Sequence, residues 1–148
     1  AQYARQQAKA PTYSFTVPGA PESKQRARVT WWRTRPHAYT PQATVQSEEG
    51  IRVQAAGLRP IAGPVALTLR FFLAIPKGWS KSKQADAMAG RVRPTVKPDW
   101  DNLGKLVSDA LQGLGYIADS QVVEAHVEKW YGDPRTEVGI CKVELRGR

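Results

Sequence analysis

Residues 97–114 read KPDWDNLGKLVSDALQGL, and they carry the clearest helical pattern in the chain. From residue 102 to residue 114, apolar side chains recur at spacings of three and four, which predicts an amphipathic helix that buries one face. Glycines at 113 and 115 are expected to end it, because glycine is common just beyond a helix C-terminus. The apolar positions are Leu103, Leu106, Val107, Ala110, Leu111 and Leu114.

Strands are predicted on both sides of this helix, where apolar residues alternate with polar ones. The segment 65–75 has the longest alternation, and 12–17 shows the same pattern near the N-terminus. Residues 122–131 and 136–145 follow the helix as two further strands. The turn residues 132–135 between them predict a hairpin.

Two more helices are predicted, at 40–56 and 80–90, from capping residues at their starts and glycines at their ends. Strands at both ends with helices between them indicate an α+β fold, in which a mixed β-sheet packs against helices. We expect one domain over residues 12–148. Residues 1–11 lack a sustained apolar face and are predicted to be a flexible tail.

The composition favours a soluble protein with a polyanionic partner. Of the 148 residues, 41% are hydrophobic, and the net charge of +9 favours nucleic acid as a partner. No apolar run approaches the roughly 20 residues that span a bilayer, and no secretory signal is visible, so no membrane partner is expected. One cysteine and two histidines fit a reducing cytoplasm and leave carboxylates as the ligands for any metal ion.

The charge is unevenly distributed along the chain. Residues 1–98 carry 16 basic and 4 acidic side chains, whereas residues 99–148 carry 6 basic and 9 acidic ones. A basic surface binds phosphates, but a module that only binds DNA has little use for the acidic part. We therefore expect a basic body with an acidic focus within it.

Asp99 and Asp101 precede the predicted helix and form the centre of this focus. If residues 99–101 are extended, both side chains point to the same side, about 6.5–7 Å apart, and can converge on one cation. Mg²⁺ suits them, because it is usually bound by one or two protein carboxylates together with waters and phosphate oxygens. The alternatives are a helix cap and an exposed ion-pair ladder formed by Asp101, Lys105 and Asp109.

Asp119 is the third acidic candidate and lies shortly before the strand that begins at Val122. It returns to Asp99 only if that strand lies beside the segment that carries Asp99. The alternative is a loop aspartate that makes a local side-chain turn.

Residues 97–131 resemble the core of the RusA family of Holliday-junction resolvases, and looser similarity extends over 12–145. The family pattern is K-P-D-x-D-N-L-x-K, then D-A-L, then D-x-Q-V, then a strand that ends in lysine and an aromatic residue. In this chain the pattern falls on Lys97, Pro98, Asp99, Asp101, Asn102, Leu103 and Lys105, then Asp109, Ala110 and Leu111, then Asp119, Gln121 and Val122, then Lys129 and Tyr131.

The resemblance implies a RusA-like fold and a homodimeric, Mg²⁺-dependent endodeoxyribonuclease, bacterial or phage-encoded. Such an enzyme resolves four-way DNA junctions by paired symmetric nicks in recombination and repair. The resemblance also implies that Asp99, Asp101 and Asp119 bind the metal ion, with Mn²⁺ as a substitute, and that Lys105 is catalytic. Many members have two consecutive acids where this chain has Ala118 and Asp119, which indicates a dispensable first acid or weaker metal binding.

Two other functions remain open on this evidence from the residues. One is a non-catalytic protein that binds junctions or other DNA on the same fold, and its binding would persist in EDTA. The other is a Mg²⁺ nuclease specific for flaps or replication forks. Junction, flap and duplex substrates compared at equal salt distinguish these functions, because DNA affinity depends strongly on salt.

Ten basic residues are candidates for phosphate contacts, although any one of them is as often part of a solvated surface. Trp31, Trp32 and Trp100 lie near them or near the acidic motif. We expect these tryptophans to be buried in the core or in a dimer interface, the alternative being stacking on unpaired bases at a junction centre. The ten basic candidates are Lys24, Arg26, Arg28, Arg33, Arg35, Lys81, Lys83, Arg91, Arg93 and Lys97.

Overall fold

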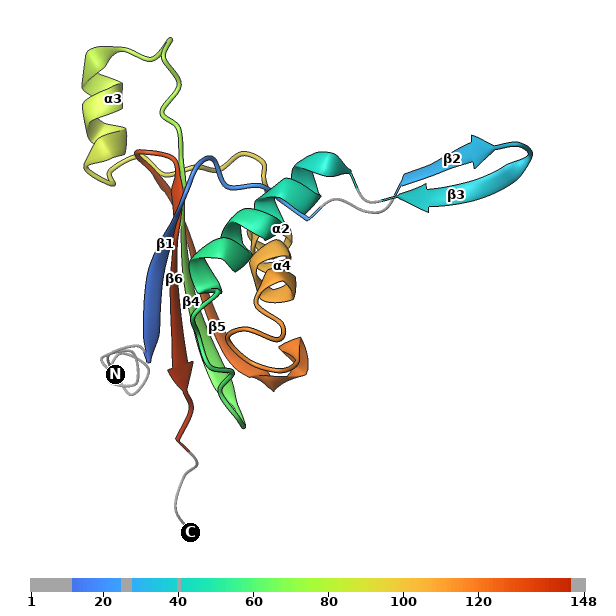
Figure 1. Cartoon of the computed structure of the whole chain (residues 1–148). Helices are drawn as coiled ribbons and strands as arrows, with labels where there is room; N and C mark the ends of the chain where they lie inside the picture. The colour runs from blue at the N-terminus through green and yellow to red at the C-terminus, as the bar shows by residue number, and fades with distance from the viewer. Residues whose placement is uncertain (1–11, 25–27, 40, 145–148) are drawn as a thin grey trace.

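The computed structural model describes residues 12–24, 28–39 and 41–144 (Figure 1). Its centre is a four-stranded sheet in the order β1-β6-β4-β5, in which β4 and β5 are parallel and the other neighbours antiparallel. The predicted α+β fold with a mixed sheet is confirmed. The tail predicted over residues 1–11 lies outside the described ranges. The strands are β1 (Tyr13–Pro18), β4 (Val65–Leu73), β5 (Val122–Tyr131) and β6 (Arg135–Lys142).

Helices α2 (Gln42–Ala55) and α4 (Trp100–Ala110) cover one face of this sheet (Figure 1). Alternate residues of β4 point to that face and are buried, as the sequence pattern predicts. The predicted apolar stripe of α4 packs against them, and this burial holds the helix in place. The buried side chains of β4 and α4 are Val65, Leu67, Leu69 and Phe71, and Leu103, Leu106, Val107 and Ala110.

The short helix α3 (Lys81–Met88) lies at one end of the sheet, away from α2 and α4 (Figure 1). The Ser80 hydroxyl accepts a hydrogen bond from the Lys83 backbone N–H at 3.2 Å, so the predicted cap is confirmed. No helix in the described ranges is long and apolar enough to cross a membrane.

The hairpin predicted for the last two strands is wrong. Strand β4 lies between β5 and β6 and bonds to both, so these two consecutive strands are not neighbours. The short connection between them crosses the end of β4, where the Gly132 N–H donates to the Leu73 carbonyl at 3.0 Å. A Cβ at Gly132 would lie 3.2 Å from a Phe72 ring carbon, so glycine permits this close crossing.

A two-stranded ribbon, β2 (Arg28–Trp32) and β3 (Arg35–Tyr39), lies in a segment for which the sequence predicted no strand. It extends away from the sheet and helices (Figure 1). The described side chains from Val29 to Tyr39 are all exposed. The expectation that Trp31, Trp32 and Trp100 are buried in the core is therefore wrong, since they are 71%, 70% and 61% exposed. Their burial in a dimer interface stays a prediction.

Candidate functional site

The acidic motif lies at the N-terminus of α4. Asp99 occupies the N-cap position with an extended backbone, and its carbonyl accepts the Leu103 N–H at 3.1 Å. Its carboxylate makes no cap hydrogen bond, so capping by the side chain does not explain this aspartate. The helix begins at Trp100, two residues earlier than predicted. The condition under which the two side chains would point to the same side, an extended segment from Asp99 to Asp101, is not met, because Asp101 already belongs to the first helical turn.

Both carboxylates of this motif are accessible. Asp99 and Asp101 are exposed, and no described side chain donates a hydrogen bond to either of them. They lie at the positive end of the helix dipole, which stabilises their negative charge at the surface. These are hard oxygen donors that remain available for a ligand.

Lys105 joins this helix to the third predicted acid. Its ammonium group lies 2.9 Å from Asp109 Oδ1, one turn further along α4, and 3.4 Å from Asp119 Oδ2. Asp119 begins the 3-10 turn η1 (Asp119–Gln121), which follows the α4 connection and leads into β5. The structure therefore brings Lys105, Asp109 and Asp119 together. Asp101 lies one helical turn before Lys105 on the same helix.

Gln121 fixes the segment that carries Asp119. Its side-chain oxygen accepts the backbone N–H groups of Ile117 and Ala118 at 2.8 and 3.0 Å. Its amide nitrogen donates to the carbonyls of Ile61 and Gly63 at 2.8 and 2.9 Å. Sequence reasoning matched Gln121 to the family pattern without giving it a role; these four bonds indicate that it positions Asp119.

Tyr116 lies in the connection between α4 and Asp119 and anchors it to α4. Its side chain is fully buried, and its hydroxyl donates to the Ser108 carbonyl at 2.8 Å. Burial raises the pKa of this hydroxyl to about 12, because the phenolate would be poorly solvated. Tyr116 is therefore a neutral structural donor rather than an acid or base of the site.

The ion pairs continue beyond Lys105 into a network that sequence reasoning missed. Lys24 Nζ lies 3.3 Å from Asp109 Oδ2 and also donates to Glu48 Oε1 on α2. Asp109 thus accepts from two lysines, one on its own helix and one on the segment after β1. These contacts join residues far apart in the chain, so no local pattern could have revealed Glu48.

The two lysines of this network are held in their charged form. The hydrogen bond to Glu48, opposed by partial burial, raises the pKa of Lys24 above its ordinary value. The hydrogen bond and charge of Asp109 do the same for the pKa of Lys105. Lys24 was predicted to contact DNA, but its ammonium group is already engaged by two carboxylates within the fold.

Two of the three predicted metal ligands, Asp99 and Asp101, are available to a hard divalent cation. In the described part of the chain, no three His, Cys, Asp or Glu side chains lie close enough together to hold a metal ion. Mg²⁺ needs only one or two protein carboxylates, with waters and phosphate oxygens completing its octahedron. The two unengaged carboxylates of Asp99 and Asp101 meet that requirement. Asp119 interacts with Lys105 in this structure.

The predicted phosphate contacts fall into distinct groups. Arg33 and Arg35 are exposed on the ribbon, and Lys81 and Lys97 are exposed on the body. The residue Arg26 and the side chain of Arg28 lie outside what the structure describes.

The other three basic candidates are exposed but have partners. The guanidinium of Arg93 stacks 3.6 Å from the Trp130 ring centroid, and Lys83 lies 3.9 Å from that of Trp79. Arg91 pairs with Asp86 at 2.9 Å. Such contacts orient the basic groups without removing them from the surface.

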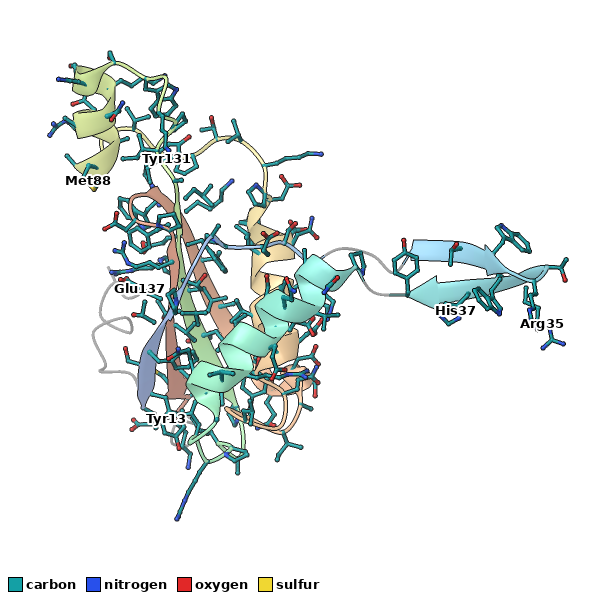
Figure 2. The ribbon with its side chains drawn as sticks, turned by 45° about the horizontal axis from the view of Figure 1, so that its top comes forward. Tyr13, Arg35, His37, Met88, Tyr131 and Glu137 are labelled. Carbon is teal, nitrogen blue, oxygen red and sulfur yellow. The ribbon has the colours of Figure 1, made fainter. Side chains whose placement is uncertain are left out.

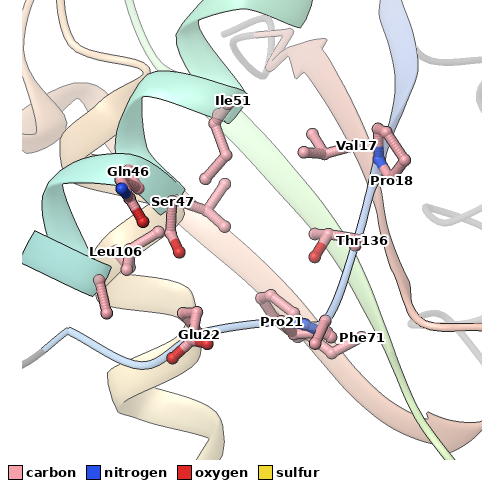
Figure 3. Close-up of a pocket in the computed structure, with 15 residues that line it drawn as sticks. Val17, Pro18, Pro21, Glu22, Gln46, Ser47, Ile51, Phe71, Leu106 and Thr136 are labelled. Atoms are coloured by element: carbon pink, nitrogen blue, oxygen red, sulfur yellow. The ribbon is translucent and has the colours of Figure 1, made fainter.

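A pocket lined partly by apolar side chains lies away from these residues. It has a volume of about 320 Å³ and opens between the segment after β1, α2 and the sheet (Figure 3). Its walls include Phe71 and Leu106, and Glu22 and Ser47 contribute polar groups (Figure 3). None of the described residues that line it is Lys or Arg, so it does not fit a DNA phosphate.

Comparison with known proteins places the ribbon, the acidic motif, Lys105 and Asp119 within one protein family. The model of the family described as endodeoxyribonuclease RusA matches residues 18–141. The chain belongs to the RusA endodeoxyribonuclease family. The match includes the ribbon, the acidic motif, Lys105 and Asp119, and it confirms the resemblance noted in the sequence. RusA family members are nucleases that act on branched DNA junctions in recombination.

A bacterial relative has nearly the same extent. It is "Uncharacterized protein YqaN" of Bacillus subtilis (strain 168), which is 38% identical over 135 residues. The alignment covers 87% of this chain and 95% of the relative. The two proteins are thus similar over nearly their whole lengths.

Proposed function

We propose that this RusA family member is a Mg²⁺-dependent, structure-selective endodeoxyribonuclease that resolves four-way DNA junctions by paired symmetric nicks. The contact between Lys105 and Asp119 carries the proposal. It joins two parts of the family motif that are 14 residues apart, and it lies one helical turn from Asp101. Apolar packing of α4 and the return of the chain into β5 account for the fold in this region. The exposed carboxylates of Asp99 and Asp101 are therefore not needed to stabilise it.

Hydrolysis of a phosphodiester requires an in-line water, stabilisation of negative charge on the phosphate, and neutralisation of the leaving 3′ oxygen. When bound, a divalent cation polarises a phosphate oxygen and lowers the pKa of water. Asp99 and Asp101 would hold this cation, and Mn²⁺ could replace Mg²⁺. Asp119 would serve as the third carboxylate if it exchanged its contact with Lys105 for the cation. Lys105 remains an ammonium ion and stabilises the charge that develops on the phosphate.

Paired nicks require two sites that face symmetric strands. A homodimer with two-fold symmetry supplies them, because each subunit then presents the same acidic motif to one strand of the junction. Dimer formation is part of the proposal. Sedimentation of the protein alone and bound to one junction tests it, with two subunits per junction as the expected stoichiometry.

The decisive experiment is cleavage of a synthetic mobile four-way junction with Mg²⁺, with Mn²⁺ and with EDTA. Linear duplex, flap and fork substrates are run at equal salt. We expect paired nicks in opposing arms that require the metal ion. Tight junction binding without cleavage would favour a non-catalytic binding protein, and preferred cleavage of flaps or forks would replace the junction as the substrate.

Single substitutions then test the proposed carboxylates. Asp99→Asn, Asp101→Asn and Asp119→Asn should each abolish cleavage while keeping or improving junction binding, because each removes a negative charge near DNA. Asp133→Asn is the matched control, since this exposed aspartate lies in the β5–β6 connection and makes the same charge change there. Cleavage retained in all three motif variants would remove the proposed site.

A further inference from the structure

The β2–β3 ribbon presents a large apolar area that the described part of the chain does not cover. Trp31 and Trp32 are the most exposed of the large hydrophobic residues described. Their neighbour Val29 is 64% exposed. A two-stranded ribbon is marginally stable alone in water, and large exposed apolar groups generally mark an interaction site. These features indicate that the ribbon functions in contact with a partner.

The pairing register places one tryptophan on each face of the ribbon. Trp31 lies opposite Pro36 and Trp32 lies opposite Arg35, and successive residues of a strand point to opposite faces. Trp32 immediately precedes the turn of Arg33 and Thr34, and Trp31 is one residue earlier. The tip of the ribbon is therefore a thin two-stranded element with an aromatic ring on either side.

The turn keeps this tip narrow. Arg33 and Thr34 connect the strands directly and have φ values of 45° and 70°, in the left-handed region. A two-residue turn of this kind matches the twist of the strands. Non-glycine residues rarely adopt this conformation, and a β-branched residue is strained in it. Strain of this sort at an exposed tip is typical of a functional position, and here it presents Arg33 at the end of the ribbon.

Charge identifies the partner as a polyanion. Residues 23–47 contain five Lys or Arg and no Asp or Glu. Figure 2 shows Arg35 and His37 on the ribbon, away from the body of the molecule. A basic, aromatic surface of this kind suits single-stranded or unstacked DNA, where bases stack on aromatic rings and phosphates bind arginine.

The chain shortly before the ribbon is bound beside the acidic motif. The backbone N–H of Lys24, shortly before β2, donates to the Asn102 carbonyl in the first turn of α4 at 3.0 Å. On the other side, β3 leads to Pro41, the buried N-cap residue of α2. The ribbon therefore projects from the same end of the molecule as Asp99 and Asp101. Its five-residue strands extend about 16 Å.

We propose, on the basis of the nuclease function above, that the ribbon is a wedge for the branch point of a DNA junction. Trp31 and Trp32 stack on the exposed faces of two different bases, one on each side of the ribbon. Arg33 and Arg35 bind the adjacent phosphates. Stacking is interrupted at a branch point, so base faces are available there that a linear duplex does not offer. The wedge thus supplies preference for branched DNA and directs the acidic motif to the strands beside it.

Affinity measurements in EDTA separate stacking from phosphate binding. The full chain and its variants are titrated with an immobile four-way junction and with a duplex of equal length, at several salt concentrations. Trp31→Ala/Trp32→Ala should lose at least about 25-fold in junction affinity, since each of the two stacked bases contributes from about fivefold to about 150-fold. Its duplex affinity and salt dependence should not change. Trp31→Phe/Trp32→Phe should recover most of the loss.

The matched comparison is Arg33→Ala/Arg35→Ala, in the same ribbon. This variant should weaken junction and duplex binding alike and reduce the slope of log K against log salt by about 0.9 for each phosphate that is no longer bound. Because the tryptophans are exposed, their replacement should leave thermal unfolding unchanged. The single variants Trp31→Ala and Trp32→Ala repeat this test with only one exposed indole removed in each.

Three results would overturn the wedge. They are equal loss on junction and duplex in the tryptophan variants, full retention of junction preference, and dissociation of a dimer in sedimentation, which would assign the ribbon to a protein contact. A wild-type chain without junction preference or metal-dependent cleavage would instead count against the proposed nuclease function. A wild type that cleaves junctions, with tryptophan variants that bind them equally well, would exclude the wedge alone.

Discussion

Lys105 is held between two carboxylates that come from different elements, Asp109 on α4 and Asp119 on η1. Its raised pKa keeps the side chain cationic at neutral pH, so it serves as a charge rather than as a proton acceptor. Asp109 in turn contacts Lys24, which pairs with Glu48. A network of four charged side chains, namely Asp109, Asp119, Lys24 and Glu48, thus orients the lysine that we place at the phosphate.

Replacement of Lys105 should reduce cleavage without changing its dependence on pH. We expect Lys105→Ala to lower the rate about 10²- to 10³-fold, the typical effect of removing one charge-stabilising donor. A raised lysine pKa means that the charge is present at all lower pH values and is lost only as pH rises through a value above 10.5. Rates measured from pH 6 to 9.5 should therefore show no loss due to Lys105. A decline in this range that Lys105→Arg removes would contradict the assignment.

Asp109→Asn tests the positioning role of the network. The amide has the same shape but cannot hold two ammonium groups, so Lys105 should lose orientation and its pKa should fall toward the ordinary value. We expect about tenfold slower cleavage, unchanged junction affinity, and the onset of an alkaline decline at lower pH than in the wild type. Glu124→Gln, an exposed acid on β5, is the control for charge alone. A simple loss of stability with no change in pH profile would indicate a purely structural residue.

Periodicity predicted the elements that bury a continuous face, and it failed where tertiary context decides. The apolar positions of α4 and β4 were identified because burial repeats along each element. The ribbon was missed because its turn, Arg33-Thr34, contains neither glycine nor asparagine, the usual signals for positive φ. The connection at 132–135 has the residue types of a hairpin turn. Its composition does not reveal that β4 lies between the two strands that it joins. The charge distribution and the spacing of Asp99 and Asp101 indicated the acidic motif and the family pattern added Lys105, whereas the contact of Asp119 with Lys105 required the fold.

Two glycines with opposite environments test the helical assignments. Gly50 lies inside α2, and a Cβ there would meet nothing within 4 Å. Gly50→Ala should stabilise the protein by about 0.5–1 kcal/mol, because alanine restricts the unfolded chain and favours the helix. Urea unfolding at constant m-value measures this change. Destabilisation would show that α2 does not continue through residue 50.

The contrasting substitution is Gly90→Ala, after α3. Gly90 has φ +80°, and a Cβ there would lie 2.9 Å from the Trp130 ring. We expect destabilisation of more than about 1 kcal/mol from the left-handed conformation alone. The same urea titration measures it, and a neutral result would mean that the ring moves freely and that the segment after α3 is not fixed against β5.

The fold of the whole molecule depends on strands that come late in the chain. Strand β1 pairs with β6, and β4 pairs with both β5 and β6, so the first strand and the last are joined directly. The ribbon, in contrast to these strands, does not contribute to the fold, because its described side chains are exposed and lie outside the core. The core that stabilises the fold and the ribbon that we propose as the DNA wedge thus lie in different parts of the chain.

Truncation should reveal this division. A chain that ends at residue 132 lacks β6, and we expect it to show no cooperative unfolding transition, since β1 loses its partner and β4 one of two neighbours. Replacement of residues 29–38 by two glycines should leave the transition cooperative and its midpoint nearly unchanged. Circular dichroism during thermal unfolding measures both. A cooperative transition in the truncated chain would contradict the sheet order.

The position of β6 also has a consequence for the nascent protein. A chain emerging from the ribosome exposes its basic segment and its three motif aspartates before the strand that completes the sheet has been made. Strand β1 pairs only with β6 in the described sheet, so the sheet beneath the aspartates is incomplete until β6 has been made. If the proposed nuclease function is correct, the acidic motif therefore gains its folded support only after β6 has been synthesised.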